Sequence, residues 1–110
     1  MGPVVNKLSI SGIVASRPKL TETINGDHVL SFHLESPRPN APSLPPYTFL
    51  VVTYSRSAED AYRRIKKGDA VLIRGTLNLT DGKHKAKCYI HALSIEVKYR
   101  NGAPVPENVP

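Results

Sequence analysis

One segment of the chain carries the periodicity of a helix, and strand-like sequence fills most of the rest. Ser57 is a candidate helix N-cap, with Asp60 at the position of a capping-box acid. Apolar residues follow at the helical spacing i, i+3, i+4 and i+7: Ala58, Ala61, Tyr62 and Ile65. Gly68 supplies a stop signal. The sequence therefore predicts one short helix within a predominantly β protein.

Five segments have the composition or the alternation of strands. In residues 28–36, for example, Leu30, Phe32 and Leu34 share one face. The first segment contains Gly12, and a glycine inside a strand often marks a bulge or a bend. The expected strands are residues 6–16, 28–36, 47–54, 70–79 and 85–99. Between the second and the third, residues 37–46 hold five prolines and are expected to form a long loop.

The order of these elements indicates an architecture. Five strands with one helix between the third and the fourth are the arrangement of the OB-fold, a small β-barrel. The last strand changes phase at Ala92-Leu93, where a bulge would keep the apolar side chains of both halves in the core. We therefore expect an all-β, five-stranded OB-fold barrel over residues 1–100 and a disordered tail over residues 101–110.

A basic hairpin lies near the end of the predicted barrel. Asp81-Gly82 is a strong signal for a tight turn, and the strand after it alternates between two faces. Ammonium groups beside a phenol and an imidazole suit a charged polymer that carries flat rings, which is most simply single-stranded nucleic acid. The polar face of this strand holds Lys83, Lys85, Lys87, Tyr89 and His91, and the apolar face holds Ala86, Cys88, Ile90 and Ala92.

Further candidate contacts flank the expected binding surface. OB-folds bind oligonucleotides on strands two and three and on the loops that join strands one to two and four to five. Arg17, Lys19 and Arg38 lie in loops beside that surface, and His33 lies on the outward face of the second strand. The alternative to phosphate binding by the hairpin lysines is a purely protective role. Lysines on an exposed edge strand keep it soluble and prevent it from pairing with another chain.

The third strand carries the candidate stacking rings. Tyr47 and Phe49 share one of its faces, and Tyr54 takes the other unless a bulge intervenes. One set would stack on bases and the other would pack inside, and the sequence leaves the choice open. Phe32 and Tyr62 are expected in the core.

The composition narrows the function classes. The chain contains fifteen Lys and Arg and nine Asp and Glu, which gives a net charge of +6. This charge favours a polyanionic partner, although a solvated surface whose charge only aids solubility would look the same. Four histidines and the single Cys88 match no metal-ligand spacing, so neither metal nor cofactor is expected. Cys88 lies on the apolar face and is expected to be a buried thiol. No phosphate loop or nucleophile elbow occurs, and we expect no enzyme.

The same residues predict where the protein acts. No apolar run is long enough to cross a membrane, and the first residues lack the pattern of a signal peptide. One cysteine cannot form an internal disulfide. We expect a cytoplasmic protein without a membrane partner.

Three stretches resemble the bacterial single-stranded DNA-binding protein (SSB) family and its short relative, primosomal replication protein N (PriB). Residues 6–14 are similar to the first strand of the family, with a glycine six residues after Asn6. Residues 67–77 are similar to the glycine after the helix and the following strand, and residues 90–97 resemble the last strand of the primosomal relative. The resemblance implies an OB-fold that forms dimers or tetramers and binds single-stranded DNA by stacking and phosphate contacts.

The chain departs from the larger members of that family in two ways. It has no acidic run near residue 110, and it has no Trp, so that Tyr and Phe would stand in as stacking residues. Both departures favour a short, primosomal-type or otherwise specialised relative, although a chain trimmed of its tail would also lack the acidic run. The resemblance also implies a homodimer in which the first strand pairs across a two-fold axis, and the exposed parity of that strand is mostly small or polar. Its residues are Val5, Lys7, Ser9, Ser11 and Ile13.

The leading hypothesis is sequence-independent binding of single-stranded DNA in replication, repair or restart. One alternative is an adaptor of primosome type that recruits a helicase or a helicase loader and touches DNA only secondarily. Another is an RNA-binding OB domain, because OB surfaces stack RNA bases equally well.

Overall fold

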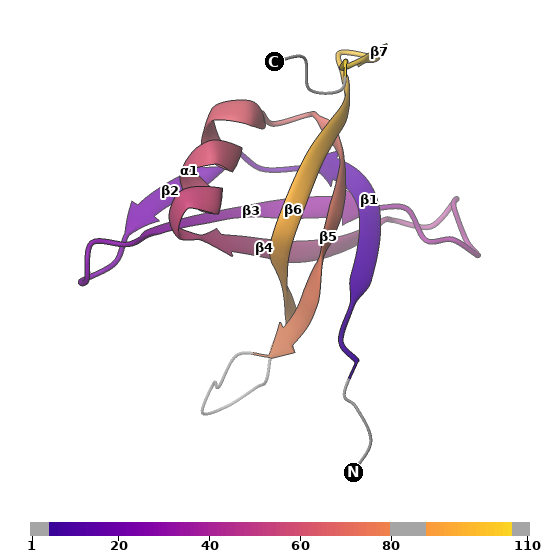
Figure 1. The fold of residues 1–110 in the computed structure, drawn as a ribbon. Coiled ribbons are helices and arrows are strands. Elements are labelled where there is room, and N and C mark those ends of the chain that lie inside the picture. Colours follow the sequence, from indigo (N-terminus) through magenta and orange to yellow (C-terminus); the bar gives the residue numbers. More distant parts are fainter. Residues whose placement is uncertain (1–4, 80–87, 107–110) are drawn as a thin grey trace.

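The structure is a computed structural model and describes residues 5–79 and 88–106. Strands make up most of these residues. Figure 1 shows one helix beside a strongly curved sheet. The elements in chain order are β1 (Leu8–Val14), β2 (Lys19–Glu22), β3 (His28–Ser36), β4 (Tyr47–Tyr54), α1 (Ser55–Arg64), β5 (Ala70–Leu79), β6 (Cys88–Arg100) and β7 (Ala103–Pro104).

Five of these strands form a closed barrel. β1 pairs with β5, β5 with β6, β4 with β3, and β3 again with β1, all antiparallel. A short parallel pairing of β4 with β6 completes the circuit. β2 adds to β3 and β7 adds to β6 outside this circuit. The predicted five-stranded OB-fold barrel is confirmed, with its helix between the third and fourth barrel strands.

The core lies inside the barrel and under the helix. Phe32, expected in the core, is buried there, but Tyr62 is 48% exposed and its prediction was wrong. The buried side of α1 is narrow, so Tyr62 lies on its flank. The buried apolar residues are Val14, Leu30, Phe32, Leu34, Val51, Ala58, Ala61, Ile65, Val71, Ile73, Ile90, Ala92 and Ile95.

The helix starts and ends earlier than its sequence signals suggest. Tyr54 is the N-cap residue, without a side-chain cap, and Ser55 turns the chain sharply with φ of 58°. Ser57, the predicted cap, therefore lies inside the helix. The helix ends at Arg64, and Gly68 adopts φ of 95° in the turn beyond it. Because β4 runs directly into α1, Tyr54 is held at the junction of strand and helix.

The predicted bulge in β6 is present. Arg74 pairs with Ser94 and Gly75 with Ala92, so Leu93 is the extra residue. A Cβ atom at Gly75 would collide with the carbonyl oxygen of His91. The bulge needs this glycine because the two backbones approach too closely for any side chain.

Two short strands lie where loops or disorder were expected. β2 lies within the predicted loop 17–27, and β7 lies within the predicted tail 101–110. Asn101 and Gly102 both have positive φ, as in the two-residue turn that closes tight hairpins. Of the expected tail, residues 107–110 lie outside the described part.

Cys88 is exposed, contrary to the expected buried thiol. It does belong to the apolar parity of β6, but it pairs with Leu79 at the end of the β5–β6 ribbon. Leu79 is exposed as well, because the ribbon extends past the barrel there.

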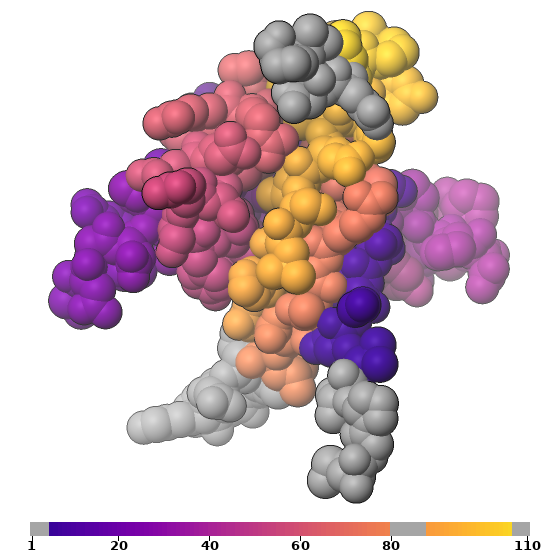
Figure 2. Space-filling model, in the orientation of Figure 1, coloured from indigo at the N-terminus to yellow at the C-terminus, as the bar shows by residue number. Residues whose placement is uncertain are grey.

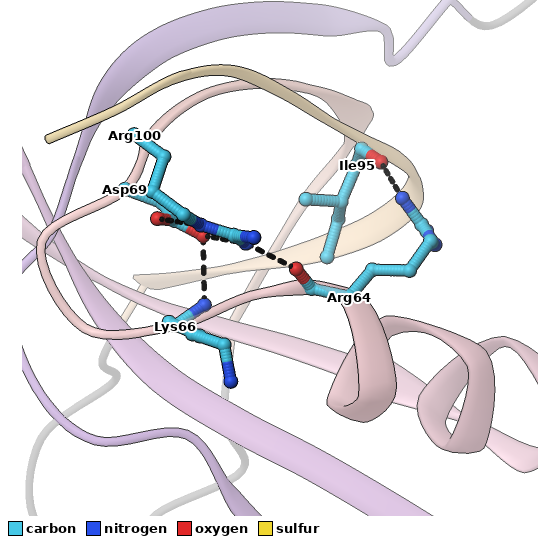
Figure 3. Close-up of polar contacts among 5 residues, drawn as sticks. All are labelled: Arg64, Lys66, Asp69, Ile95 and Arg100. Carbon is cyan, nitrogen blue, oxygen red and sulfur yellow. Dashed lines mark hydrogen bonds and ion pairs between the residues drawn. The ribbon is translucent and has the colours of Figure 1, made fainter. Parts of the chain in front are cut away.

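A buried carboxylate ties the helix end to two strands. Asp69, 2% exposed, accepts hydrogen bonds from the Arg100 guanidinium at 2.8 and 2.9 Å and from the Lys66 backbone N–H at 2.8 Å (Figure 3). Arg100 also donates to the Arg64 carbonyl at 2.7 Å, and Arg64 donates to the Ile95 carbonyl at 2.9 Å. The bonds from Arg100, above all, lower the pKa of the Asp69 carboxyl. This network fixes the C-terminal end of β6.

Replacing Asp69 by Asn should destabilise the fold by about 3 kcal/mol, because it leaves the Arg100 guanidinium without its buried partner. The matched control Asp60→Asn, at an exposed i,i+4 pair with Arg64, should cost less than about 1 kcal/mol. Urea unfolding at neutral pH measures both.

The Asp69 contribution also has a predicted pH dependence. Its pKa is lowered in the folded state, so its stabilisation is complete above the unfolded value of about 3.9. The difference between wild type and Asp69→Asn should shrink as the pH falls below about 4 and through the folded pKa. Equal costs for the two variants at neutral pH would contradict this role of Asp69.

Candidate nucleic-acid interface

The outer face of the barrel presents a row of paired side chains that crosses five strands. The strand register places Lys19 beside Ser31, Ser31 beside Val52, Val52 beside His91, and His91 beside Thr76. Their sequence neighbours Leu30, Val51 and Ile90 are buried, so the row points away from the core. Four spacings between neighbouring strands give the row a length of about 19 Å, measured along the curved sheet.

An aromatic cluster lies next to this row, at the β4–β6 pairing. Tyr54 and His91 meet edge to face, with ring centroids 5.0 Å apart and planes at 84°. Tyr54 is 39% exposed, and its hydroxyl lies near enough to the Tyr89 hydroxyl to interact with it electrostatically. Burial, and then the interaction with Tyr89, raise the pKa of Tyr54 above its usual value of 10.0. Strands from opposite halves of the sequence thus hold three rings together; we call Tyr54, Tyr89 and His91 the ring cluster.

The opposite end of the face is polar and basic. The backbone N–H of His33 donates to the Ser16 Oγ at 2.8 Å, and the His33 Nδ1 lies 3.3 Å from the same oxygen. His33 is exposed on β3, opposite Leu50 of β4. Arg17 and Lys19 are exposed on the segment that follows Ser16. Three cationic or titratable side chains therefore border the face at β2 and β3.

Tyr47 and Phe49 lie on the other face of β4, as their parity requires. Phe49 is half-buried against the core, whereas Tyr47 is 46% exposed at the start of the strand. Their ring centroids are 6.0 Å apart, and the Arg38 guanidinium lies 4.6 Å above the centre of the Tyr47 ring. Arg38 is held further by donating to the Pro45 carbonyl at 2.8 Å. The structure thus contains a second, separate group of rings with a cation.

The structure brings together only part of the predicted set. Tyr54 and Tyr89 lie together, with Arg17, Lys19 and His33 farther along the same face, while Arg38, Tyr47 and Phe49 form the second group. Lys83, Lys85 and Lys87 lie outside the described residues.

Sequence reasoning missed Ser16, Val52 and Thr76. Ser16 carries no motif, because its contact with His33 joins residues 17 positions apart. Val52 and Thr76 enter the face only through the strand register.

Other kinds of site are not found in the described part of the chain. Residues 5–79 and 88–106 contain no group of three or more His, Cys, Asp or Glu side chains that could hold a metal ion. Within the same residues, the one helix is too short to span a bilayer.

The comparison with known families decides the assignment. Residues 5–98 match the single-strand binding protein family. This chain belongs to that family. The match includes the helix, the ring cluster and the barrel strands, with β6 covered as far as Lys98. No curated protein matches the chain.

Solved structures of family members have the same fold. The SSB domain of a protein from Synechococcus sp. is 16% identical, with a TM-score of 0.72 over 86% of this chain and 98% of that one. A deletion mutant of the single-stranded DNA binding protein from Thermus aquaticus is 22% identical, with a TM-score of 0.72 over 94% of this chain. The present chain covers 45% of the length of that Thermus aquaticus chain.

The raised pKa of Tyr54 gives a test of the ring cluster. Its phenol should ionise above about pH 10, the value of a free phenol. Because the folded pKa lies above the unfolded one, the contribution of Tyr54 to stability is complete below about pH 10 and is lost as the pH rises. The ultraviolet difference titration of wild type against Tyr54→Phe measures this ionisation. A titration centred at or below pH 10 would contradict the burial of Tyr54 and its interaction with Tyr89.

Proposed function

We propose that this protein binds single-stranded DNA, without sequence preference, across the outer face of β2, β3, β4 and β6. The observation that carries the proposal is the ring cluster of Tyr54, Tyr89 and His91 at one end of a row whose other end is bordered by Arg17, Lys19 and His33. The family assignment supports the same ligand class.

The chemistry of the face accounts for binding without sequence reading. Bases would stack on Tyr54 and Tyr89, since every base offers a flat face, and each stack contributes about 1–3 kcal/mol. Arg17 and Lys19 would pair with phosphates. Between these ends the row presents Val52, whose side chain has no hydrogen-bonding group, and Ser31, whose single hydroxyl cannot form the paired hydrogen bonds that distinguish one base from another. Lys83, Lys85 and Lys87, in the segment of sequence between β5 and β6, are proposed as further phosphate contacts.

The second group of rings offers a separate place for a base. The Tyr47 ring is exposed on one side and carries the Arg38 guanidinium, a combination that binds unpaired bases in a sequence-tolerant way. It lies on the face of β4 opposite Tyr54. A strand that used both groups would therefore pass around the β3–β4 ribbon.

The cellular role that we propose is replication, repair or restart in the cytoplasm, with a restart helicase or its loader as a protein partner. This role rests on the sequence resemblance to the short primosomal relative of the family. Preference for DNA over RNA is part of the proposal, and competition between DNA and RNA oligomers of equal length tests it.

Binding to oligo-dT should be strongly salt-dependent. The logarithm of the affinity should fall by about 0.7 per logarithmic unit of salt for each phosphate contacted. Tyr54→Ala should weaken binding about 5- to 150-fold, the loss of one stack. The matched control is Tyr62→Ala, an exposed ring on α1 outside this face. Fluorescence anisotropy at two salt concentrations measures all three proteins. Equal affinities of the two variants, or binding that ignores salt, would overturn the proposed mechanism.

A homodimer through β1 is the second part of the proposal. β1 pairs with β5 from Leu8 to Ile13 but with β3 only at Ile13 and Val14, so among the described residues no strand pairs with its other edge over most of its length. The Ser36 hydroxyl donates to the Ser11 carbonyl at that edge, and Ser9, two residues earlier, directs its backbone groups the same way. A free edge invites a second copy to pair with it across a two-fold axis.

Light scattering should therefore give twice the mass of one chain at micromolar concentration. Ser9→Pro removes one edge N–H and should shift the equilibrium toward monomer. The matched control is Ser9→Ala, which keeps the backbone N–H and should leave the dimer intact. A monomeric wild type would reject the β1 dimer.

A further inference from the structure

An open groove runs between α1 and β6, the helix and strand that lie side by side in Figures 1 and 2. It consists of two hollows of about 220 and 830 Å³ that share Asp60 and Arg64 in their linings. We call it the α1–β6 groove. From Ala92 in the smaller hollow to Lys98 in the larger one, β6 advances about 20 Å.

The α1–β6 groove starts beside the ring cluster. Its smaller hollow is lined on the helix by Ser57, three residues after the N-cap Tyr54, and on β6 by Ala92, directly after His91. Thr53 and Ala92 themselves face the core, so the groove lies next to the rings, where β4 becomes α1, and a strand leaving the rings would turn into it.

The charges of the groove favour a polyanion. The larger hollow is lined by four cationic side chains and two carboxylates. Both carboxylates are already neutralised: Asp60 pairs with Arg64 at 2.9 Å, and Glu96 pairs with Lys98 at 2.7 Å and with Arg74 at 2.8 Å.

Arg63 takes no part in the ion pairs of Asp60 and Glu96. It lines the larger hollow, is exposed, and makes no ion pair or side-chain hydrogen bond with the described residues. Arg100 is held by Asp69 and faces the same hollow.

We propose that single-stranded DNA leaving the ring cluster continues along the α1–β6 groove, with a phosphate bound by Arg63. This inference rests on the proposed function and extends its site along the barrel. The groove adds length to the binding site, so its contribution depends on the length of the oligonucleotide. Short oligomers fill the ring cluster and the row alone.

The experiment compares oligo-dT of about 6 nucleotides, near the lower end of the ~4–16 nucleotides that one OB-fold occupies, with oligo-dT of about 20 nucleotides, beyond the upper end. Arg63→Gln should bind the long oligomer about two- to five-fold more weakly, as expected for an exposed charge, and its salt slope should fall by about 0.7. Its affinity for the short oligomer should not change. The control is Lys67→Gln, which removes the same charge from an exposed residue outside the groove and should leave both affinities unchanged.

A gain-of-charge variant tests the same path from the other direction. Ser94 lines the smaller hollow and is exposed, so Ser94→Lys should strengthen binding of the long oligomer alone. If wild type binds neither oligomer, the proposed function itself fails. If it binds both, but Arg63→Gln and Lys67→Gln behave alike, or Arg63→Gln weakens short and long equally, the groove is not part of the DNA path and the proposed function stands without it.

Discussion

The parallel pairing of β4 with β6 is the constraint on which the site depends. It involves only Val51 with Ile90 and Val52 with His91, yet it closes the barrel. It also brings Tyr54, at the end of β4, into contact with His91 and Tyr89 from a segment more than thirty positions later. Without this closure the ring cluster would not exist, because no other pairing links β4 to β6.

β6 can make that pairing because it is bent and anchored. The extra residue Leu93, opposite the close approach at Gly75, bends the strand between its two halves. Beyond the bend, the Asp69–Arg100 pair and the bond from Arg64 to the Ile95 carbonyl hold the second half against the helix end. A strand fixed on both sides of its bend holds its rings in place before any ligand arrives. The loss of side-chain entropy on binding is then smaller, which strengthens binding.

Much of the fold could be predicted from the sequence because it depends on local patterns. Alternation located the barrel strands, and the phase change at Ala92-Leu93 located the bulge. The errors arose where an element's end or surroundings mattered more than its pattern. Tyr62 has helical spacing but lies beside the buried stripe, and Cys88 has the apolar parity but lies where the ribbon leaves the barrel. The helix began before Ser57 because the turn at Ser55 joins it directly to β4.

The candidate site could be predicted in kind but not in arrangement. The sequence indicated rings and cations on strands, yet it could not decide between Tyr47 and Tyr54, and the structure places them on opposite faces of β4. Contacts such as Ser16 with His33 and Tyr54 with His91 arise from strand register between distant segments. The Asn101-Gly102 turn that forms β7 did have a local signal, the Asn-Gly dipeptide, which a reading of the tail as disordered overlooked.

Ultraviolet crosslinking of oligo-dT to the protein, with mapping of the modified residues by mass spectrometry, tests whether the closed barrel gathers Tyr54, Tyr89 and His91 into one surface for unpaired bases. We expect adducts on these residues, from β4 and β6 together. Adducts confined to the face of β1 and β5, with none on the ring cluster, would contradict it.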